Sequence, residues 1–364
     1  MLNISDYGYK YIGIETTNRC NMECTFCGLP IRDTPLKDQK QKDINYILEE
    51  LAGYQGIEHV TLHYYGEPLM DRQIWKYIDT CRELGLKTHL TTNGLLLNDK
   101  NIDLILKHSP DTLHISVHVL TPEHHKEVRG VKVSFEVYIK RITRCLAAMI
   151  DKEHQIKDIR MDLAVNDDRY FGFQGKRRKL AEILGLVENG DPTIYNETPH
   201  SLEPRLQNFL ELLEEESSSF KFDAINLKEH TDQYYTKESQ INFLDRGYTI
   251  RPNITINYKQ FYNGRKMESY YPVKNSKCGT EYIGIMVDGT VTCCCIDYKG
   301  KTGIGNIFEE NLETILAKNS HIINGFRKTG DLYFDVCRTC MGSPTKHGAV
   351  IKNVVRSIRK AIEQ

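Results

Sequence analysis

Three cysteines near the start of the chain, Cys20, Cys24 and Cys27, fall within one stretch of eight residues. Thiolates are preferred ligands of iron–sulfur clusters and of structural zinc ions. A structural zinc site usually takes four ligands in paired spacings, whereas this stretch offers three at uneven spacing. Three ligands on a four-iron cluster leave one iron open, where a substrate or cosubstrate can bind. The stretch therefore favours an iron–sulfur cluster over a zinc loop or a set of buried thiols.

Six further cysteines lie in the last quarter of the chain: Cys278, Cys293, Cys294, Cys295, Cys337 and Cys340. The C-x2-C spacing of the last two is typical of a metal knuckle. The dipeptide Asp288-Gly289 separates the apolar runs Tyr282–Val287 and Thr290–Cys294, which predicts a hairpin that presents further thiols. We expect a second metal centre here, either an iron–sulfur cluster or a four-cysteine zinc site.

The composition of the 364-residue chain excludes several classes of protein. Hydrophobic residues make up 40% and charged residues 27%, which is typical of a globular protein and argues against a disordered one. The first residues lack the regions of a signal peptide, and no apolar run is long enough to span a membrane. We expect a cytoplasmic protein whose clustered cysteines bind metal. The other two cysteines, Cys81 and Cys145, fall on apolar helix faces and are expected to be core thiols.

The net charge of −1, from 48 basic and 49 acidic residues, gives no electrostatic argument for nucleic acid or membrane as a partner. An RNA-modifying enzyme, which needs a basic surface, is therefore less favoured.

Strands alternate with helices over the first 165 residues, which predicts right-handed βαβ units and a parallel sheet or barrel. The expected strands are Tyr11–Glu15, Val60–Tyr64, Lys87–Thr91, Thr112–Val117 and Asp158–Val165. The expected helices are Asp43–Leu51, 74–84, Ile102–His108 and 134–150. Further on, the pattern predicts helices at Lys176–Leu184 and Leu206–Glu215, a sixth strand at Phe222–Leu227 and a turn at Tyr262–Arg265. His63, His114 and His118 lie on or just after strands, where each could either face the barrel lumen or be a buried, hydrogen-bonded structural histidine.

The segment YIGIETTNRCNMECTFC resembles the radical SAM superfamily, whose signature is C-x3-C-x2-C after the first barrel strand, here with Phe26 before the third cysteine. The resemblance continues through LHYYGEP (Leu62–Pro68), LTTNG (Leu90–Gly94) and the segment His114–Gly130. It implies that a four-iron cluster on the three cysteines binds S-adenosylmethionine. The implied cosubstrate-binding residues are Phe26, Gly66, Glu67, Asn93, Ser116 and Arg129. Glu67 would pair with the methionyl amino group, and Ser116 and Arg129 would hold its carboxylate. Two positions depart from the family pattern: Tyr65 replaces a glycine, and His118 stands where an acid often lies.

The last quarter resembles the SPASM or Twitch auxiliary-cluster region of the same superfamily. Counting from Gly289 selects Cys294 as the hairpin ligand, with the segment Gly303–Ile307 supplying a turn. The shorter Twitch arrangement implies a second four-iron cluster on Cys278, Cys294, Cys337 and Cys340. Cys293 and Cys295 would flank the ligand on the opposite hairpin face, where either could serve as a catalytic hydrogen donor.

The implied fold is a partial (β/α)6 TIM-like barrel with a small C-terminal cysteine-rich iron–sulfur domain. We expect the barrel core in residues 1–230, a connecting segment in 231–270 and the auxiliary domain in 271–364. Active sites of such barrels lie at the carboxyl ends of the strands, and every motif named above follows a strand.

The implied activity is cleavage of S-adenosylmethionine to a 5′-deoxyadenosyl radical, which abstracts hydrogen from a substrate. The favoured outcome is a two-electron oxidation of a small polar substrate, of sugar or aminocyclitol type. The auxiliary cluster would accept the electron, as in the aminocyclitol dehydrogenase that the chain resembles, and a flavodoxin- or ferredoxin-type protein would be the reductant.

Three alternatives remain. An epimerase would use Cys293 or Cys295 as hydrogen donor. A peptide-modifying enzyme is less favoured, because the barrel begins too early for a leader-binding domain. A structural or electron-transfer metal protein would have no need of Glu67 or Arg129.

Overall fold

The computed structural model describes residues 2–165, 199–234, 247–260 and 269–363. Its centre is one ten-stranded sheet with the strand order β10-β9-β8-β1-β2-β3-β4-β5-β7-β6. The strands from β8 to β7 in this order run parallel, whereas β6, β9 and β10 pair antiparallel with their neighbours. The strands are β1 (Tyr11–Ile14), β2 (His59–Thr61), β3 (Thr88–Thr92), β4 (Thr112–His118), β5 (Asp158–Val165), β6 (Gly247–Arg251), β7 (Ile254–Gln260), β8 (Tyr282–Ile285), β9 (Thr290–Thr292) and β10 (Gly303–Asn306).

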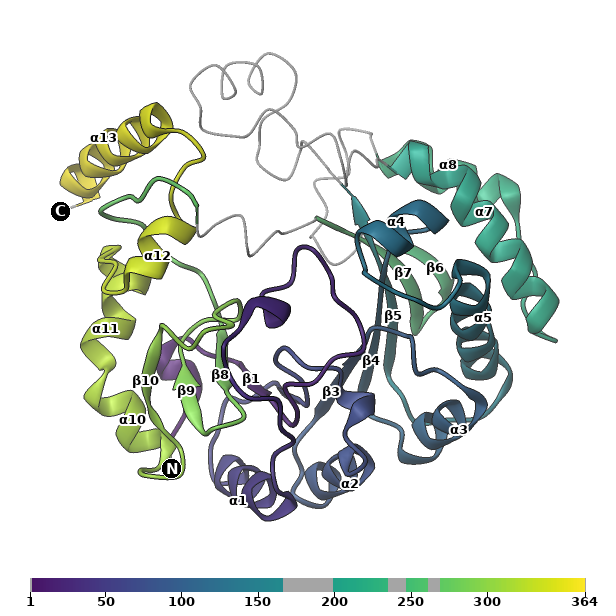
Figure 1. The fold of residues 1–364 in the computed structure, drawn as a ribbon, viewed down its shortest axis with the longest axis horizontal. Coiled ribbons are helices and arrows are strands. Elements are labelled where there is room, and N and C mark those ends of the chain that lie inside the picture. The colour runs from purple at the N-terminus through teal and green to yellow at the C-terminus, as the bar shows by residue number, and fades with distance from the viewer. Residues whose placement is uncertain (1, 166–198, 235–246, 261–268, 364) are drawn as a thin grey trace.

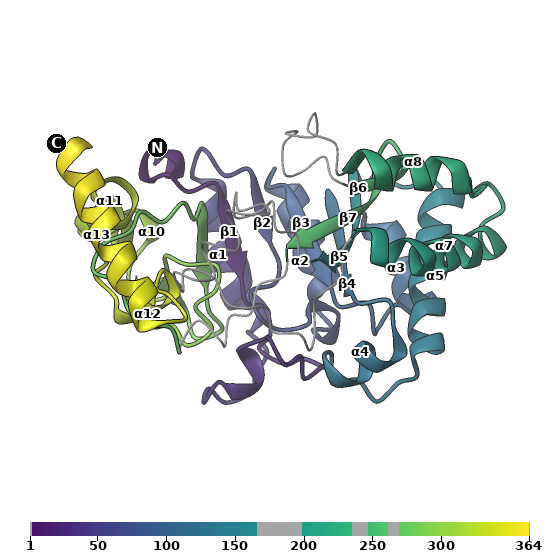
Figure 2. The same ribbon diagram turned by 90° about the horizontal axis from the view of Figure 1, so that it is seen from above.

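Helices cover the outer face of this curved sheet (Figures 1 and 2). On the barrel side they are α1 (Gln41–Ala52), α2 (Ile74–Glu83), α3 (Asp99–His108), α4 (Pro122–Glu127), α5 (Phe135–Asp151), α7 (Pro199–Glu216) and α8 (Ala224–Tyr234). The C-terminal part adds α10 (Leu312–Lys318), α11 (Ser320–Asn324), α12 (Asp335–Cys340) and α13 (Lys346–Glu363). The arrangement is a partial barrel, as the sequence predicts.

Helix α5 illustrates why these segments are helical. The Ser134 side chain caps its first turn by accepting the amide of Val137. Ile139, Ile142 and Leu146 recur at helical spacing and are buried against the sheet. Cys145 lies on the same face and Cys81 on the inner face of α2; both are fully buried, which confirms them as core thiols.

The predicted strands and helices of the first 165 residues are confirmed to within a few residues. The sixth strand is a correction. Phe222–Leu227 is not a strand, because the Asp223 carboxylate accepts the amides of Ile225 (2.9 Å) and Asn226 (3.2 Å) and thereby starts α8. The sixth parallel strand of the barrel is β7, which pairs with β5 and buries alternate residues from Ile254 to Tyr258. The predicted helix Lys176–Leu184 and turn Tyr262–Arg265 lie outside the described residues.

The C-terminal part is joined to the barrel by strand pairing. Strand β8 runs parallel to β1, with Gly13 opposite Gly284. The predicted Asp-Gly hairpin is present between β8 and β9, and Gly289 has the positive φ of 87° that such a turn requires. One expectation needs correction: Gly303–Ile307 is largely strand β10 rather than a turn. Strands β6 and β7 lie between residues 247 and 260 and extend the barrel sheet.

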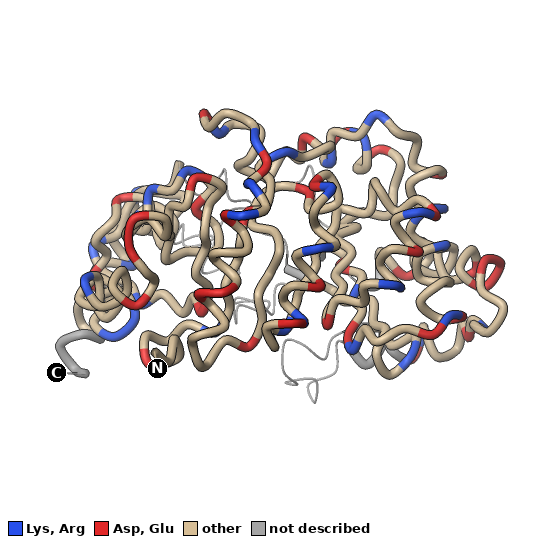
Figure 3. The backbone as a smooth tube through the Cα atoms, turned by 90° about the horizontal axis from the view of Figure 1, so that it is seen from below, with Lys and Arg blue, Asp and Glu red and all other residues tan. Residues whose placement is uncertain are grey.

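Helix hydropathy and the distribution of charged residues bear on the partners expected from the sequence. Among the helices of the described chain, none is both long and apolar enough to cross a membrane. Figure 3 shows Lys and Arg interspersed with Asp and Glu along the backbone.

Three histidines on neighbouring strands form a row of rings inside the barrel. His59 Nε2 lies 3.1 Å from His89 Nδ1, and the rings of His89 and His114 are 4.2 Å apart. The hydroxyl of Thr91 lies 3.1 Å from His89 Nε2. Burial is the main reason why the pKa of His59 is lowered, and the positive charges of Arg160 and Lys87 add to it, against the opposing effect of Glu58.

The lowered pKa of His59 predicts a stability that depends on pH. Because the unfolded chain binds a proton here at a higher pH than the folded chain, the contribution is present above about pH 6.5 and is lost as the pH falls below it. We expect the His59→Gln variant to lose less of its thermal stability than the parent protein between pH 7.5 and pH 5.5. Equal losses in the two proteins would contradict the prediction.

Candidate cluster and cosubstrate site

The loop that carries Cys20, Cys24 and Cys27 follows β1 and is held by backbone hydrogen bonds. The amide of Glu23 donates to the carbonyl of Arg129 at 3.2 Å, and the amide of Thr25 donates to that of Val128 at 2.9 Å. These bonds attach the loop to the segment that follows α4. The three thiols are half-buried and outside any disulfide.

The cysteine loop suits a metal centre in its donor chemistry. The three thiols act on one another electrostatically, and burial raises the pKa of Cys20 to about 12, with Glu67, Cys24 and Cys27 adding to the rise. A metal that binds Cys20 must therefore displace its proton.

Glu67 lies at the carboxyl end of β2 and is almost completely buried. Its Oε1 accepts the hydroxyl of Thr92 (2.8 Å) and the amide of Leu69 (3.1 Å), and its Oε2 accepts the amide of Asn93 (2.8 Å). The bond from Leu69 makes Glu67 the cap of the short helix Pro68–Met70. Burial raises the pKa of Glu67, although these hydrogen bonds and the charge of Arg129 oppose the rise. A carboxylate offers about four acceptor positions, so one remains for a further donor such as an ammonium group.

Gly66 permits the loop after β2 to touch the cysteine loop. A Cβ at this position would lie 1.9 Å from the carbonyl oxygen of Thr17. The adjacent amide of Glu67 donates to the carbonyl of Arg19 at 2.8 Å. Any side chain larger than hydrogen would separate the two loops.

Asn93 and Arg129 complete a network under the cysteine loop. The Asn93 amide group lies 3.6 Å from the sulfur of Cys20 and donates to Asn21 Oδ1 at 2.7 Å. Arg129 is buried and lies 3.2 Å from the sulfur of Met22 and 3.5 Å from the carbonyl of Asn93. The structure thus brings together four elements that the sequence analysis had related only by their order: the cysteine loop and the ends of β2, β3 and α4.

Phe26 and Ser116 lie beside the bulged end of β4. The pairing of β4 with β5 shifts register between Ser116 and His118, and His118 has a φ of 64°. The rings of Phe26 and His118 are 5.4 Å apart. Bulges next to functional sites redirect side chains. In the described part of the chain, Ser116 forms no hydrogen bond with the cysteine loop.

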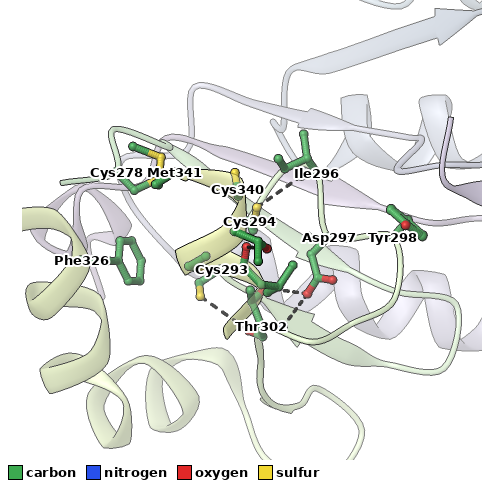
Figure 4. A pocket seen from close by; sticks show the side chains of 13 residues that line it. Cys278, Cys293, Cys294, Ile296, Asp297, Tyr298, Thr302, Phe326, Cys340 and Met341 are labelled. Atoms are coloured by element: carbon green, nitrogen blue, oxygen red, sulfur yellow. Dashed lines mark hydrogen bonds between the residues drawn. The ribbon is translucent and has the colours of Figure 1, made fainter. Parts of the chain in front are cut away.

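A cavity in the C-terminal part is lined by five cysteines: Cys278, Cys293, Cys294, Cys337 and Cys340. Figure 4 labels four of them, all but Cys337. Four of the eight other lining residues are apolar: Ile296, Phe326, Val336 and Met341. Five thiols around one largely apolar cavity suit an iron–sulfur cluster. Within the described ranges, no three Cys, His, Asp or Glu side chains are grouped closely enough to hold a single metal ion.

The three consecutive cysteines have three different surroundings. Strand β9 ends at Thr292, so the alternation of faces expected for the hairpin does not extend to them. Cys293 is buried inside the cavity, and its thiol donates to the carbonyl of Thr302 at 3.5 Å. Cys294 lines the same cavity and accepts the amide of Ile296 at 3.4 Å. Cys295 lies outside the cavity lining and is exposed, with the hydroxyl of Thr280 3.8 Å from its sulfur.

Sequence reasoning missed the residues that surround these thiols. Asp297 is buried in the cavity wall and accepts the amide and the hydroxyl of Thr302. Tyr64 and Tyr65 reach from the barrel to the cysteine triplet. The two tyrosines could have been noticed in the sequence, because they lie directly before the Gly66-Glu67 motif.

Two segments of the chain match models of known protein families. Residues 14–168 match the radical SAM superfamily, and residues 277–341 match the SPASM iron–sulfur cluster-binding domain. A radical SAM domain and a C-terminal SPASM iron–sulfur domain are therefore both detected in the chain. These domains imply [4Fe-4S] clusters as cofactors, together with S-adenosylmethionine.

Several curated proteins are similar to parts of the chain. An uncharacterized protein of Methanocaldococcus jannaschii is 34% identical over 118 residues, or 32% of this chain and 37% of the relative. A probable GTP 3′,8-cyclase of Saccharolobus islandicus is 31% identical over 176 residues, or 48% of this chain and 51% of the relative. The PqqA peptide cyclase of Rhizobium meliloti is 27% identical over 122 residues, or 34% of this chain and 32% of the relative. The matches thus span between about a third and about half of the length of these relatives.

Two solved structures cover most of the chain. Streptococcus suis SuiB bound to S-adenosylmethionine has a TM-score of 0.50 at 18% identity, over 90% of this chain and 70% of that chain. BtrN in complex with AdoMet and 2-DOIA has a TM-score of 0.46 at 12% identity, over 89% of this chain and 87% of that chain. At 18% identity, the similarity to SuiB shows that the two proteins share a fold.

The close approach at Gly66 predicts a large effect of a single methyl group. We expect Gly66→Ala to lower the free energy of unfolding by about 1–3 kcal/mol, because the new Cβ forces the two loops apart. Gly279→Ala is the matched control, since nothing lies within 4 Å of a Cβ there. Chemical denaturation of both variants checks this, and equal stability would show that the loops move apart without cost.

Proposed function

We propose that the protein is a radical SAM oxidoreductase that removes two electrons from a small polar substrate of sugar or aminocyclitol type. The observation that carries the proposal is the cavity lined by five cysteines in a domain whose strand β8 pairs directly with β1. A redox centre there would stand beside the barrel and could accept the second electron.

The residues for the first centre are Cys20, Cys24 and Cys27, and those for the second are Cys278, Cys294, Cys337 and Cys340. When bound, the first cluster and S-adenosylmethionine supply a 5′-deoxyadenosyl radical, and the second cluster supplies an electron acceptor. In the overall reaction, a C–H bond next to a hydroxyl is lost and a carbonyl forms. The substrate gives up one hydrogen atom, one electron and one proton.

The chain's own side chains would bind and orient the cosubstrate. Glu67 keeps one acceptor position for the methionyl ammonium, and its three existing hydrogen bonds hold the carboxylate in place. Arg129, buried near Met22 and Asn93, would supply charge to the methionyl carboxylate together with Ser116. Phe26 would pack beside the site, next to His118.

The substrate class does not follow from the similar proteins. The printed names of the relatives include a GTP cyclase and a peptide cyclase, whose substrates have little in common. The proposal of a small polar substrate is supported instead by the polar strand positions inside the barrel, including His89, Thr91 and His114. The reductant would be a flavodoxin- or ferredoxin-type protein.

Epimerisation is the second candidate, and the position of Cys295 favours it. This residue is exposed, lies outside the cysteine-lined cavity, and its carbonyl accepts the hydroxyl of Tyr65 at 3.4 Å. An exposed thiol outside the cavity that would hold the second cluster could return a hydrogen atom to the substrate. Cys293 is less suitable as a donor, because it is buried in the cavity wall.

Cys24→Ala tests the central proposal. After anaerobic reconstitution, we expect the parent protein to hold about eight irons and to form 5′-deoxyadenosine under reduction, whereas the variant forms none because its first cluster lacks a ligand. Cys81→Ala, which removes a core thiol, is the control and should keep the activity. Normal 5′-deoxyadenosine formation in Cys24→Ala would contradict the proposal.

A panel of aminocyclitols and sugars in deuterated water separates the two outcomes. Oxidation predicts a carbonyl product without solvent deuterium at the reacting carbon. Epimerisation predicts one solvent-derived deuterium at that carbon, with incorporation lost in Cys295→Ala.

A further inference from the structure

Two consecutive tyrosines, Tyr64 and Tyr65, connect the cosubstrate motif to the cysteine-lined cavity. They directly precede Gly66 and Glu67 in the loop after β2. Their rings pack edge to face, with centroids 4.7 Å apart. Neither has a role in the function proposed above, although their hydroxyls reach across to the C-terminal part of the chain.

The hydroxyl of Tyr64 binds the backbone of the cysteine triplet. It donates to the carbonyl of Cys294 and lies 3.0 Å from the hydroxyl of Thr292. The Tyr64 ring fits beside Gly284 because glycine has no side chain: a Cβ at position 284 would lie 2.5 Å from Tyr64 Cζ. Tyr64 is only 7% exposed, so water does not compete for these hydrogen bonds.

Tyr65 makes the parallel connection one residue further on. Its hydroxyl donates to the carbonyl of Cys295 at 3.4 Å. Its ring lies edge-on to that of Tyr298, at 6.1 Å. Tyr298 in turn packs against the first cysteine loop, because a Cβ on Gly28 would lie 2.0 Å from its ring. The thiols of Cys27, Cys294 and Cys295 all act electrostatically on Tyr65.

The geometry points to Tyr64 and Tyr65 as positioning residues that fix the Cys293–Cys295 segment relative to the cosubstrate motif. The carbonyl of Cys294 belongs to the peptide plane between Cys294 and Cys295, so the Tyr64 hydroxyl sets the orientation of the backbone that carries the proposed ligand. Tyr64 is the stronger anchor, since it is buried and has two partners, whereas Tyr65 has one longer hydrogen bond. This inference rests on the second cluster of the proposed function.

The arrangement has a direct chemical consequence for the second centre. Hydrogen bonds to the residues that carry metal ligands orient those ligands and tune the centre. Removal of the Tyr64 hydroxyl would leave the Cys294 carbonyl buried without its main donor. The segment would then shift, and the affinity of the cavity for its cluster and the reduction potential of that cluster would change.

The test uses the full chain with Cys20, Cys24 and Cys27 replaced by alanine, so that only the second centre can bind iron. Into this background we place Tyr64→Phe, Tyr65→Phe or the control Tyr77→Phe. Tyr77 is a buried tyrosine on α2 whose hydroxyl has no hydrogen-bond partner among the described residues. After anaerobic reconstitution, the rate of iron loss to a chelator and the midpoint potential are measured for each protein.

We expect Tyr64→Phe to lose iron roughly 10-fold faster than the background protein and to shift its midpoint potential. Tyr65→Phe should show a smaller change in the same direction, and Tyr77→Phe should show none. Thr292→Val, which removes the second partner of the Tyr64 hydroxyl, should fall between the two tyrosine variants. This variant keeps the test informative if Tyr64→Phe folds poorly.

The inference is overturned if Tyr64→Phe and Thr292→Val both match Tyr77→Phe in iron loss and potential. Failure of the background protein to bind any iron would be a different result. It would remove the second cluster from the proposed function, and the inference about the two tyrosines with it.

Discussion

The pairing of β8 with β1 is the constraint on which the two candidate centres depend. It sets a strand from the last quarter of the chain beside the first strand, whose following loop carries Cys20, Cys24 and Cys27. Because β9 continues from β8 through a tight turn, the cysteine triplet is delivered to the edge of the barrel where the cosubstrate motif lies. Glycines at the paired positions, Gly13 and Gly284, leave room for the rings of Tyr282 and Tyr64. The contact between the two halves is therefore built largely from backbone pairing and aromatic rings, and an exposed ion pair between Lys10 and Glu281 (3.0 Å) lies directly before the two paired strands.

Around the first cysteine loop, single polar residues make several structural contacts each. Glu67 closes a short helix, ties β2 to β3 and keeps one acceptor position open. Asn93 binds the cysteine loop through its side chain, and its carbonyl accepts the hydroxyl of Tyr138 at 2.9 Å. In a site of this kind, residues that hold the architecture and residues that would hold the cosubstrate are the same. A substitution that abolishes activity here therefore also disturbs the fold, so controls outside the network are essential.

Much of the fold could be predicted from the sequence, because the first five strands follow simple apolar patterns with turn residues between them. Strand β7 was not predicted, although its buried residues alternate with Thr255 and Asn257 as in a half-buried strand, because the surrounding sequence is polar and rich in tyrosine. The prediction of a strand at Phe222–Leu227 was wrong because the apolar content of the segment does not reveal that Asp223 caps a helix. The two groups of cysteines are visible from their spacing, whereas their assignment as cluster ligands depends on the family resemblance and stays a prediction. The different surroundings of Cys293 and Cys295 could not be predicted, because they depend on where β9 ends.

The parallel pairing of β1 with β8 also determines when the sheet can be completed during protein synthesis. A ribosome releases the start of β1 (Tyr11) 271 residues before the start of β8 (Tyr282), so the edge of β1 that faces β8 stays unpaired during that part of synthesis. Contacts between distant parts of a chain form slowly, and an unpaired strand edge is prone to wrong association. The cavity lined by the C-terminal cysteines includes Met341, so it cannot be complete before this later part of the chain has been made. A cluster in that cavity would therefore be bound late in the synthesis of the chain, whereas the N-terminal cysteine loop leaves the ribosome much earlier.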